Sequence, residues 1–325
     1  ESGAIAATQG GTIEAVGDIT AEDGNITADN GTIYTTGKIS AEKGNLIASN
    51  GSELTAGKGL TALGMDISAS TVVGNVTLTG NGESFIKDAS RVEGSITLSG
   101  GNITVSGTED GTKDAEVTGS ITGATNATLT NATVGNLTAS GVVSLTNADT
   151  GWIKDAASVS MADASTVTGD ITMAETNTGV TMDHSTLQGS IIGAVGATLE
   201  NASLVTGNLD LAGGAATIKA STVHGTITGA DTVTVSAGST VGNISEVSGK
   251  VDIDDSTTGN IATSGDVELT NAHSGTISGT DVSLSGGSSS GAITATGTVG
   301  VEDSTVNGTI SGTDVTVTGG SASGA

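Results

Sequence analysis

A glycine-punctuated repeat is the feature of this sequence that most restricts its fold. Residues 17–36 and 37–56 align glycine on glycine and share the same order of apolar and polar residues. In the first copy, three short strand-like phrases follow glycine, centred on Ile19, Ile26 and Ile33. A period of about 20 to 50 residues is typical of repeat architectures. Three short strands and three glycine corners per copy therefore predict one turn of a three-sided β-solenoid.

The repeat continues beyond this region with a shorter period. From about Thr71 the recurring phrase is Ser/Thr-Val-x-Gly-x-Ile-Thr. Its glycines lie at positions 74, 94, 119, 135, 151, 169, 189, 207, 225, 242, 259, 275, 291 and 308. Over residues 1–72 we predict regular turns of about 20 residues, and over residues 73–325 turns of about 17 residues, as repeats of one solenoid. The two parts are expected to form a single continuous elongated domain. The expected fold class is all-β, a parallel β-helix built from these repeating turns.

One interval in this series is too long for a plain turn. The stretch from Gly94 to Gly119 is longer than any other interval between these glycines. Insertions in repeat proteins are accommodated in loops between the strands. We therefore expect a loop around Thr108–Lys113, where Glu109 and Asp110 contribute acidic side chains.

The strand phrases alternate apolar and polar residues. In phrases such as Ala197–Leu199 and Val233–Val235, this alternation predicts one set of side chains inside the stack and the other outside. Many of these phrases are followed by asparagine, as at Asn131, Asn147 and Asn271. Asparagine tolerates the left-handed conformation of tight corners. At equivalent corners of successive turns, we expect such side chains to stack into ladders.

The composition favours an ordered stack over a disordered stalk rich in Ser, Thr and Gly. Proline is absent, and aromatic residues make up 1% of the chain. Proline would interrupt the ladder of a strand that is paired on both edges, whereas disordered stalks are usually rich in it. The buried layer must then consist of Ile, Val, Leu, Ala and Met. Cysteine is also absent, which excludes disulfides, thiol catalysis and Cys-based metal sites.

The chain is strongly acidic, with a net charge of −26 and only nine Lys and Arg residues. Such a surface repels nucleic acid and anionic lipid, and no apolar run is long enough to span a bilayer. We therefore expect no nucleic-acid partner and no membrane insertion of this segment. The charge is expected to keep the protein soluble. The alternatives are loose capture of divalent cations and charge-tuned contacts between copies.

Few residues suggest a chemical site. The carboxylates follow corners and outward positions. Their densest groups are Asp252, Asp254 and Asp255, and Glu109, Asp110 and Asp114. The three histidines lie at different offsets from their glycines, at His184, His224 and His273. We predict no catalytic residue and no cofactor. The one metal candidate is Ca²⁺ at Asp252, Asp254 and Asp255, because carboxylate oxygens are the ligands that this ion prefers.

The phrases Gly24–Ala28, Gly44–Ala48 and Gly101–Val105 resemble the repeats of filamentous haemagglutinin-type adhesins and of autotransporter passenger domains. The resemblance implies a right-handed parallel β-helix that is secreted and displayed on the bacterial cell surface. The sequence begins within a turn, and residues 319–325 repeat residues 286–292 before it stops. We therefore expect a segment of a longer protein.

The function expected from these features is structural. The chain is predicted to be a non-enzymatic extracellular rod of a bacterial cell-surface protein: a stalk, a surface-layer unit or a filament unit. Its expected partners are neighbouring copies of itself and a ligand on a host or cell surface. The alternatives are a polysaccharide-active β-helix enzyme and a ligand-specific adhesin.

Overall fold

The computed structural model describes residues 3–319 and 321–322 of the chain. Over these residues the protein is all-β, with parallel strands stacked in turns of about 18 residues and no helix. No helix in this part of the chain is therefore long and apolar enough to cross a membrane. Two compact units, Glu1–Thr168 and Gly169–Ala325, are described separately below as unit 1 and unit 2. Most of the terminal repeat at residues 319–325 lies outside the described residues.

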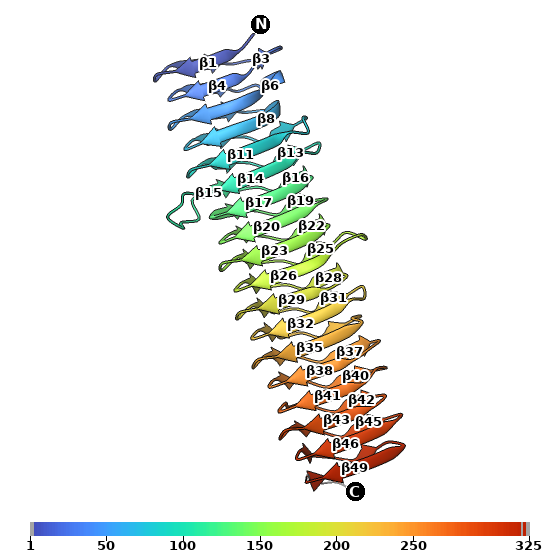
Figure 1. Cartoon of the computed structure of the whole chain (residues 1–325). Helices are drawn as coiled ribbons and strands as arrows, with labels where there is room; N and C mark the ends of the chain where they lie inside the picture. Colours follow the sequence, from blue (N-terminus) through green and yellow to red (C-terminus); the bar gives the residue numbers. More distant parts are fainter. Residues whose placement is uncertain (1–2, 320, 323–325) are drawn as a thin grey trace. The chain divides into compact units, whose positions relative to one another are not determined.

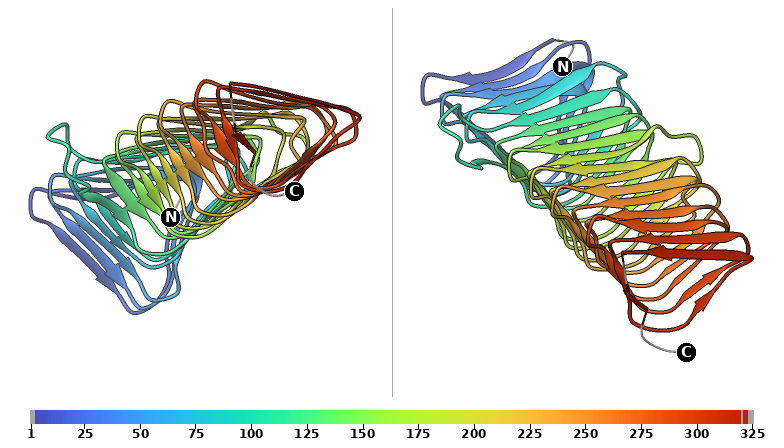
Figure 2. Two further views of the ribbon diagram at one scale, coloured as in Figure 1. Left: turned by 90° about the horizontal axis from the view of Figure 1, so that it is seen from below. Right: turned by 60° about the horizontal axis from the view of Figure 1, so that its bottom comes forward.

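Most turns contain three short strands separated by corners. One turn of unit 1 consists of β19 (Leu137–Ala139), β20 (Val142–Thr146) and β21 (Asp149–Thr150). Each strand pairs in parallel with the strand at the same place in the next turn, so that Leu137 lies opposite Ile153. Figure 2 shows the turns stacked in this way. The predicted parallel β-solenoid is confirmed.

The strands of unit 1 form three sides. The first side begins at the recurring Gly-x-Ile phrase, and the second and third sides follow it in chain order. The first side comprises β3 (Ile19–Ala21), β10 (Val76–Leu78), β13 (Ile96–Leu98), β16 (Ile121–Ala124), β19 and β22 (Ile153–Ala156). The second side comprises β1 (Ile5–Thr8), β4 (Ile26–Asp29), β11 (Glu83–Lys87), β14 (Asn102–Ser106), β17 (Asn126–Thr130), β20 and β23 (Ser158–Ala162). Two long strands run through both sides, β6 (Ile39–Ser49) and β8 (Leu60–Ser68). The third side comprises β2 (Thr12–Ala15), β5 (Thr32–Thr35), β7 (Glu53–Ala56), β9 (Thr71–Val73), β12 (Arg91–Glu93), β15 (Ala115–Val117), β18 (Ala132–Val134), β21 and β24 (Thr166–Val167).

Unit 2 has the same three sides. The first comprises β25 (Ile171–Met173), β28 (Ile191–Ala194), β31 (Leu209–Leu211), β34 (Ile227–Thr228), β37 (Ile244–Val247), β40 (Ile261–Thr263), β42 (Ile277–Gly279), β45 (Ile293–Ala295) and β48 (Ile310–Ser311). The second comprises β26 (Gly179–Asp183), β29 (Ala197–Glu200), β32 (Ala215–Lys219), β35 (Thr232–Ser236), β38 (Val251–Asp254), β41 (Val267–Thr270), β43 (Val282–Ser285), β46 (Thr298–Glu302) and β49 (Asp314–Thr318). The third comprises β27 (Thr186–Leu187), β30 (Leu204–Val205), β33 (Thr222–Val223), β36 (Thr240–Val241), β39 (Thr257–Thr258), β44 (Ser289–Ser290), β47 (Thr305–Val306) and β50 (Ser321–Ala322).

Aliphatic side chains fill the interior of each unit. On the first side of unit 1, Ile96, Ile121 and Leu137 lie opposite one another in successive turns and are fully buried. In unit 2, Ile227 and Ile244 do the same. Burial of each such side chain contributes about 1.5 to 3 kcal/mol. The predicted inward and outward alternation of the strand phrases is confirmed.

The turns become shorter along unit 1, as hydrogen bonds between equivalent positions of neighbouring turns show. The backbone N–H of Asn45 donates to Oδ1 of Asn25, which lies 20 residues earlier in the chain. The N–H of Val142 donates to Oδ1 of Asn126, which lies 16 residues earlier. The boundary expected at residues 72 and 73 and the single continuous domain stay predictions.

The loop expected in the long interval lies between β14 and β15. Across this interval the backbone N–H of Ser120 donates to Oγ of Ser95, which lies 25 residues earlier in the chain. Residues 107–114 within it form no strand. Figure 1 shows this loop projecting from the stack beside β15. The prediction of a loop around Thr108–Lys113 is confirmed.

The asparagine corners adopt the expected left-handed conformation. The φ angles of Asn131, Asn147 and Asn271 are 49°, 47° and 48°. The amide Nδ2 of Asn147 donates a hydrogen bond of 2.9 Å to Oδ1 of Asn131 in the preceding turn. The ladder predicted for these corners is therefore present between these two turns.

Candidate functional sites

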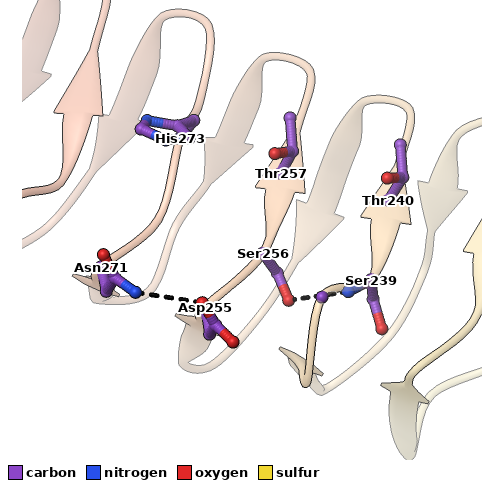
Figure 3. Close-up of a pocket in the computed structure, with 8 residues that line it drawn as sticks. Ser239, Thr240, Asp255, Ser256, Thr257, Asn271 and His273 are labelled. Carbon is purple, nitrogen blue, oxygen red and sulfur yellow. Dashed lines mark hydrogen bonds between the residues drawn. The ribbon is translucent and has the colours of Figure 1, made fainter.

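A shallow groove crosses three turns of unit 2 on the third side. Its volume is about 260 Å³. Thr240, Thr257 and His273 occupy the same place in successive turns along it, and the corner residues Asp255 and Asn271 lie at one end (Figure 3). The groove brings together a histidine, hydroxyl groups and a carboxylate, so its hydrogen bonds decide whether it has the geometry of a catalytic site.

The polar side chains of this groove pair along the stack. Nδ1 of His273 lies 2.7 Å from Oγ of Ser289 in the next turn. Nδ2 of Asn271 donates to Oδ1 of Asp255 at 3.0 Å (Figure 3). A catalytic serine needs a base that is itself oriented by a third group. In the described part of the chain, the carboxylate of Asp255 accepts its hydrogen bond from Asn271 rather than from His273. The hydrogen bonds of this groove therefore connect neighbouring turns.

The carboxylates considered for Ca²⁺ lie on two different elements. Asp252 and Asp254 project outward from β38, whereas Asp255 lies at the following corner with a φ of 47°. Asp252 forms an ion pair of 3.3 Å with Lys250, and Asp255 accepts the hydrogen bond from Asn271. Among the described residues, no three His, Cys, Asp or Glu side chains are placed to hold a metal ion together. Ca²⁺ binding by Asp252, Asp254 and Asp255 stays a prediction.

The three histidines occupy different places within their turns. His184 lies at a corner with a φ of 49°, His224 directly follows β33, and His273 bridges Thr257 and Ser289. Because these places are not equivalent, the stack does not align the imidazoles with one another. The structure therefore gives the histidines no common role.

A second groove of unit 2, of about 470 Å³, is bordered by charged residues. Nζ of Lys250 lies 2.5 Å from Glu268 and 3.3 Å from Asp252, and the hydrogen bond to Glu268 is the main reason that the pKa of Lys250 is raised. The backbone N–H of Thr298 donates to Asp281 at 2.6 Å and lowers the pKa of that carboxyl. Ion pairs on an exposed surface contribute little to stability. The groove thus combines several carboxylates with one basic side chain.

A column of buried serines holds the corner before the third side. In unit 2, Ser203, Ser221 and Ser239 are 1%, 4% and 1% exposed. The backbone N–H of Ser203 donates to Oγ of Ser221 at 3.2 Å, and that of Ser221 donates to Oγ of Ser239 at 3.1 Å. The Ser221 hydroxyl donates to the carbonyl of Lys219, and the Ser239 hydroxyl to that of Ser236. Each hydroxyl therefore accepts a hydrogen bond from a buried N–H of the preceding turn and donates one to a C=O of its own corner.

The sequence analysis missed this column because serine is mostly an exposed, turn-forming residue. A signal was present in the spacing. Serine comes directly after the left-handed corner residue in turn after turn, as in Ala202–Ser203, Ala220–Ser221 and Asp255–Ser256. A polar residue that recurs at one fixed offset in a stack indicates an internal ladder rather than scattered surface positions.

A second polar ladder follows the recurring glycine of the first side. Oδ1 of Asn208 accepts a hydrogen bond from the backbone N–H of Thr226 at 2.9 Å. In the same way Asn243 accepts from Asn260, and Asn260 from Thr276, both at 2.9 Å. Asparagine after this glycine therefore connects neighbouring turns at a corner where the strands have ended.

The loop between β14 and β15 is tied to later turns of unit 1. Nδ2 of Asn147 donates to the carbonyl of Gly111 at 2.8 Å. Nζ of Lys113 lies 2.6 Å from a carboxylate oxygen of Asp149. These contacts hold the loop against the corner before the third side.

The carboxylate of Asp110 is engaged within this loop. Asp110 accepts hydrogen bonds from the hydroxyl and the backbone N–H of Thr112, at 2.6 and 2.9 Å. The hydroxyl of Thr112, followed by its N–H and the hydroxyl of Thr108, lowers the pKa of Asp110. The loop is thus folded around its own acidic residue.

Comparison with protein-family models, with characterised proteins and with solved structures finds no match. The fold itself supports one class, that of the β-helix repeat proteins. Adhesin or passenger character has no support beyond the repeat phrases and this fold class.

Proposed function

We propose that this chain is a structural element without catalytic activity, serving as a stiff acidic scaffold. The observation that carries the proposal is the use of its polar groups between turns. In the part of the chain that the structure describes, every buried side-chain nitrogen or oxygen has a hydrogen-bond partner. A stack held by contacts between neighbouring turns suits a stalk, a surface-layer unit or a filament unit.

The bacterial cell surface is the proposed location. The net charge of −26 keeps copies soluble, and the repeat phrases resemble those of surface adhesins. Specific adhesion usually depends on aromatic anchors, whereas this chain has one Phe, one Trp and one Tyr. We therefore place the scaffold ahead of the ligand-specific adhesin.

A polysaccharide-active enzyme is the alternative candidate. The second groove of unit 2 combines Asp266, Glu268 and Asp281 with the basic side chain of Lys250. Cleavage of an acidic polysaccharide by paired carboxylates with a basic partner would need such a combination. Lys250 is paired with Glu268, and the Asp281 carboxylate accepts a hydrogen bond from Thr298, so the scaffold is favoured.

An activity screen separates the two functions. The full chain is incubated with acidic polysaccharides in the presence and absence of Ca²⁺, and new chain ends are measured. The scaffold proposal expects none above the background of a boiled sample. Turnover that is lost in Asp254→Asn, Asp255→Asn or Lys250→Ala would overturn it, with Asp183→Asn as the control for an exposed carboxylate elsewhere on the second side.

The proposed location is tested on intact cells that produce the protein. Antibody labelling and brief protease treatment should reach the chain without permeabilising the cells. Labelling that appears only after lysis would contradict the cell-surface location.

A further inference from the structure

The second side of unit 1 carries a face without charge. β14, β17, β20 and β23 lie side by side there in successive turns (Figure 1). Their outward side chains, called here the neutral face, are Asn102, Thr104, Ser106, Asn126, Thr128, Thr130, Val142, Ser144, Thr146, Ser158, Ser160 and Ala162. None of these side chains is ionisable.

Among the described strands of the second side, uncharged strands follow one another in successive turns only in this region. The sequence has no charged residue from Val117 to Ala148, although 14% of the chain is charged. The preceding strand, β11, presents Glu83 and Lys87. In unit 2 the outward charges of the second side include Asp183, Glu200, Lys219, Asp252, Asp254, Glu268 and Glu302. The neutral face therefore stands out against otherwise similar strands.

The neutral face is regular as well as uncharged. β14 pairs with β17, and β20 with β23, over five residues each without a shift in register. Asn126 donates a hydrogen bond to Asn102 at 2.9 Å across two of its turns. Val142, the first residue of β20, is 50% exposed and adds an apolar contact at the edge of the face. Successive turns repeat about every 4.8 Å, so the outward side chains form rows.

A second copy of this chain matches these rows in two ways. Its own neutral face carries no charge, and its turns have the same spacing. Two chains with a net charge of −26 repel each other, and the repulsion is least where neither chain presents a charge. The cores of protein interfaces are likewise depleted in charged residues. An identical copy has the same spacing between turns, so its outward side chains stay in step across the contact.

We propose that the neutral face is the surface through which neighbouring copies of this chain pack side by side, as a two-fold pair in which the same face meets itself. The proposal rests on the structural function proposed above and names the contact that such a scaffold uses.

The size of the neutral face sets the strength of the contact. Strands of five residues in four neighbouring turns span roughly 17 by 15 Å, or about 250 Å² per copy. The pair then buries roughly 500 Å², less than the about 1,200 Å² of a stable complex. The contact is therefore transient in dilute solution and gains strength where many copies are held close together.

Cysteine capture detects such a transient contact, and the chain has no cysteine of its own. Thr128→Cys and Ser144→Cys chains, alone and mixed, are oxidised at high protein concentration, and the disulfide-linked dimer is followed over time. Thr234→Cys is the control, because Thr234 is an exposed residue of the second side that lies beside Asp252. We expect the neutral-face pairs to form dimer about tenfold faster than the control. Each rate is divided by the rate at which the same thiol reacts with a small alkylating reagent.

Two further variants show whether charge governs the contact. Adding Thr128→Asp to the Ser144→Cys chain should reduce dimer formation to the control rate, whereas adding Thr128→Asn should leave it high. Equal normalised rates for Ser144→Cys, Thr128→Cys, their mixture and Thr234→Cys would overturn the proposal. Retention on a neutral polysaccharide matrix that Thr128→Asp abolishes, together with equal oxidation rates, would assign the face to a glycan instead. Neither result depends on the activity screen, so failure here leaves the scaffold proposal standing.

Discussion

Buried hydroxyl groups align neighbouring turns at the level of single residues. Ser221 and Ser239 each accept a hydrogen bond from the preceding turn and donate one within their own corner. The equivalent corner has a fully buried alanine at Ala148 in unit 1 and at Ala272 in unit 2. The column therefore tolerates a missing hydroxyl in some turns, and the cost of losing one can be measured.

Ser239→Ala should lower the free energy of unfolding by about 1 to 2 kcal/mol, because the N–H of Ser221 loses its hydrogen-bond partner in a buried corner. Urea denaturation followed by circular dichroism measures the change. Thr234→Ala, which removes an exposed hydroxyl, should change it by less than about 0.5 kcal/mol. Equal changes in the free energy of unfolding for the two substitutions would show that the buried serine hydroxyls stabilise the fold no more than an exposed hydroxyl does.

The recurring glycines permit close approach of one turn to the next. A Cβ built on Gly225 would overlap the carbonyl of Gly207 in the preceding turn. We predict that Gly225→Ala lowers the free energy of unfolding by about 2 kcal/mol or more, because the added methyl group overpacks against backbone. Gly300→Ala is the matched control, since a Cβ there meets nothing within 4 Å. The same urea denaturation experiment compares the two variants. A loss of unfolding free energy for Gly225→Ala that is no larger than that for Gly300→Ala would contradict the close approach.

The loop between β14 and β15 is the element that departs most from the regular turn in unit 1. Its position was predictable from one long interval between glycines. Its anchoring was not, because the partners of Gly111 and Lys113 are Asn147 and Asp149, each 36 residues later. Contacts across two turns become visible only when the turns are stacked.

Asn147→Ala should free this loop without unfolding the stack. The substitution removes the hydrogen bond to Gly111, and local opening then exposes the backbone around Lys113. We expect trypsin to cleave after Lys113 about fivefold faster or more, while the free energy of unfolding changes by less than about 1 kcal/mol. Asn201→Ala at another corner is the control, and it should leave the rate of cleavage after Lys113 unchanged.

The loop should also respond to acid. The pKa of Asp110 is lowered in the folded protein by the hydrogen bonds from Thr112 and Thr108. A lowered folded-state pKa means that these bonds are present above the unfolded pKa of about 3.9 and are lost as the pH falls through the folded value. The amide NMR signal of Thr112 should therefore shift with a midpoint below the unfolded pKa, and Asp110→Asn should abolish the shift. A midpoint at or above the ordinary value would contradict the hydrogen bonds.

At the scale of the whole molecule, the sequence predicted the architecture more fully than the sites. Glycine intervals and alternating Ile and Val positions are enough to predict stacked parallel strands, because every turn repeats the same local chemistry. The buried serines were missed because burial depends on which corners the stack encloses. The second groove was missed as well, since Lys250 and Asp281 are brought near each other only by stacking.

Pulling single chains from their two ends tests the proposed structural role most directly. Because most contacts of each turn are with its neighbours, we predict that the chain resists the pulling force and yields in steps of one or a few turns. Each unfolded turn of about 18 residues should lengthen the chain by roughly 60 Å. Smooth extension at low force, or one release of the whole chain, would contradict a scaffold built from turns that hold one another.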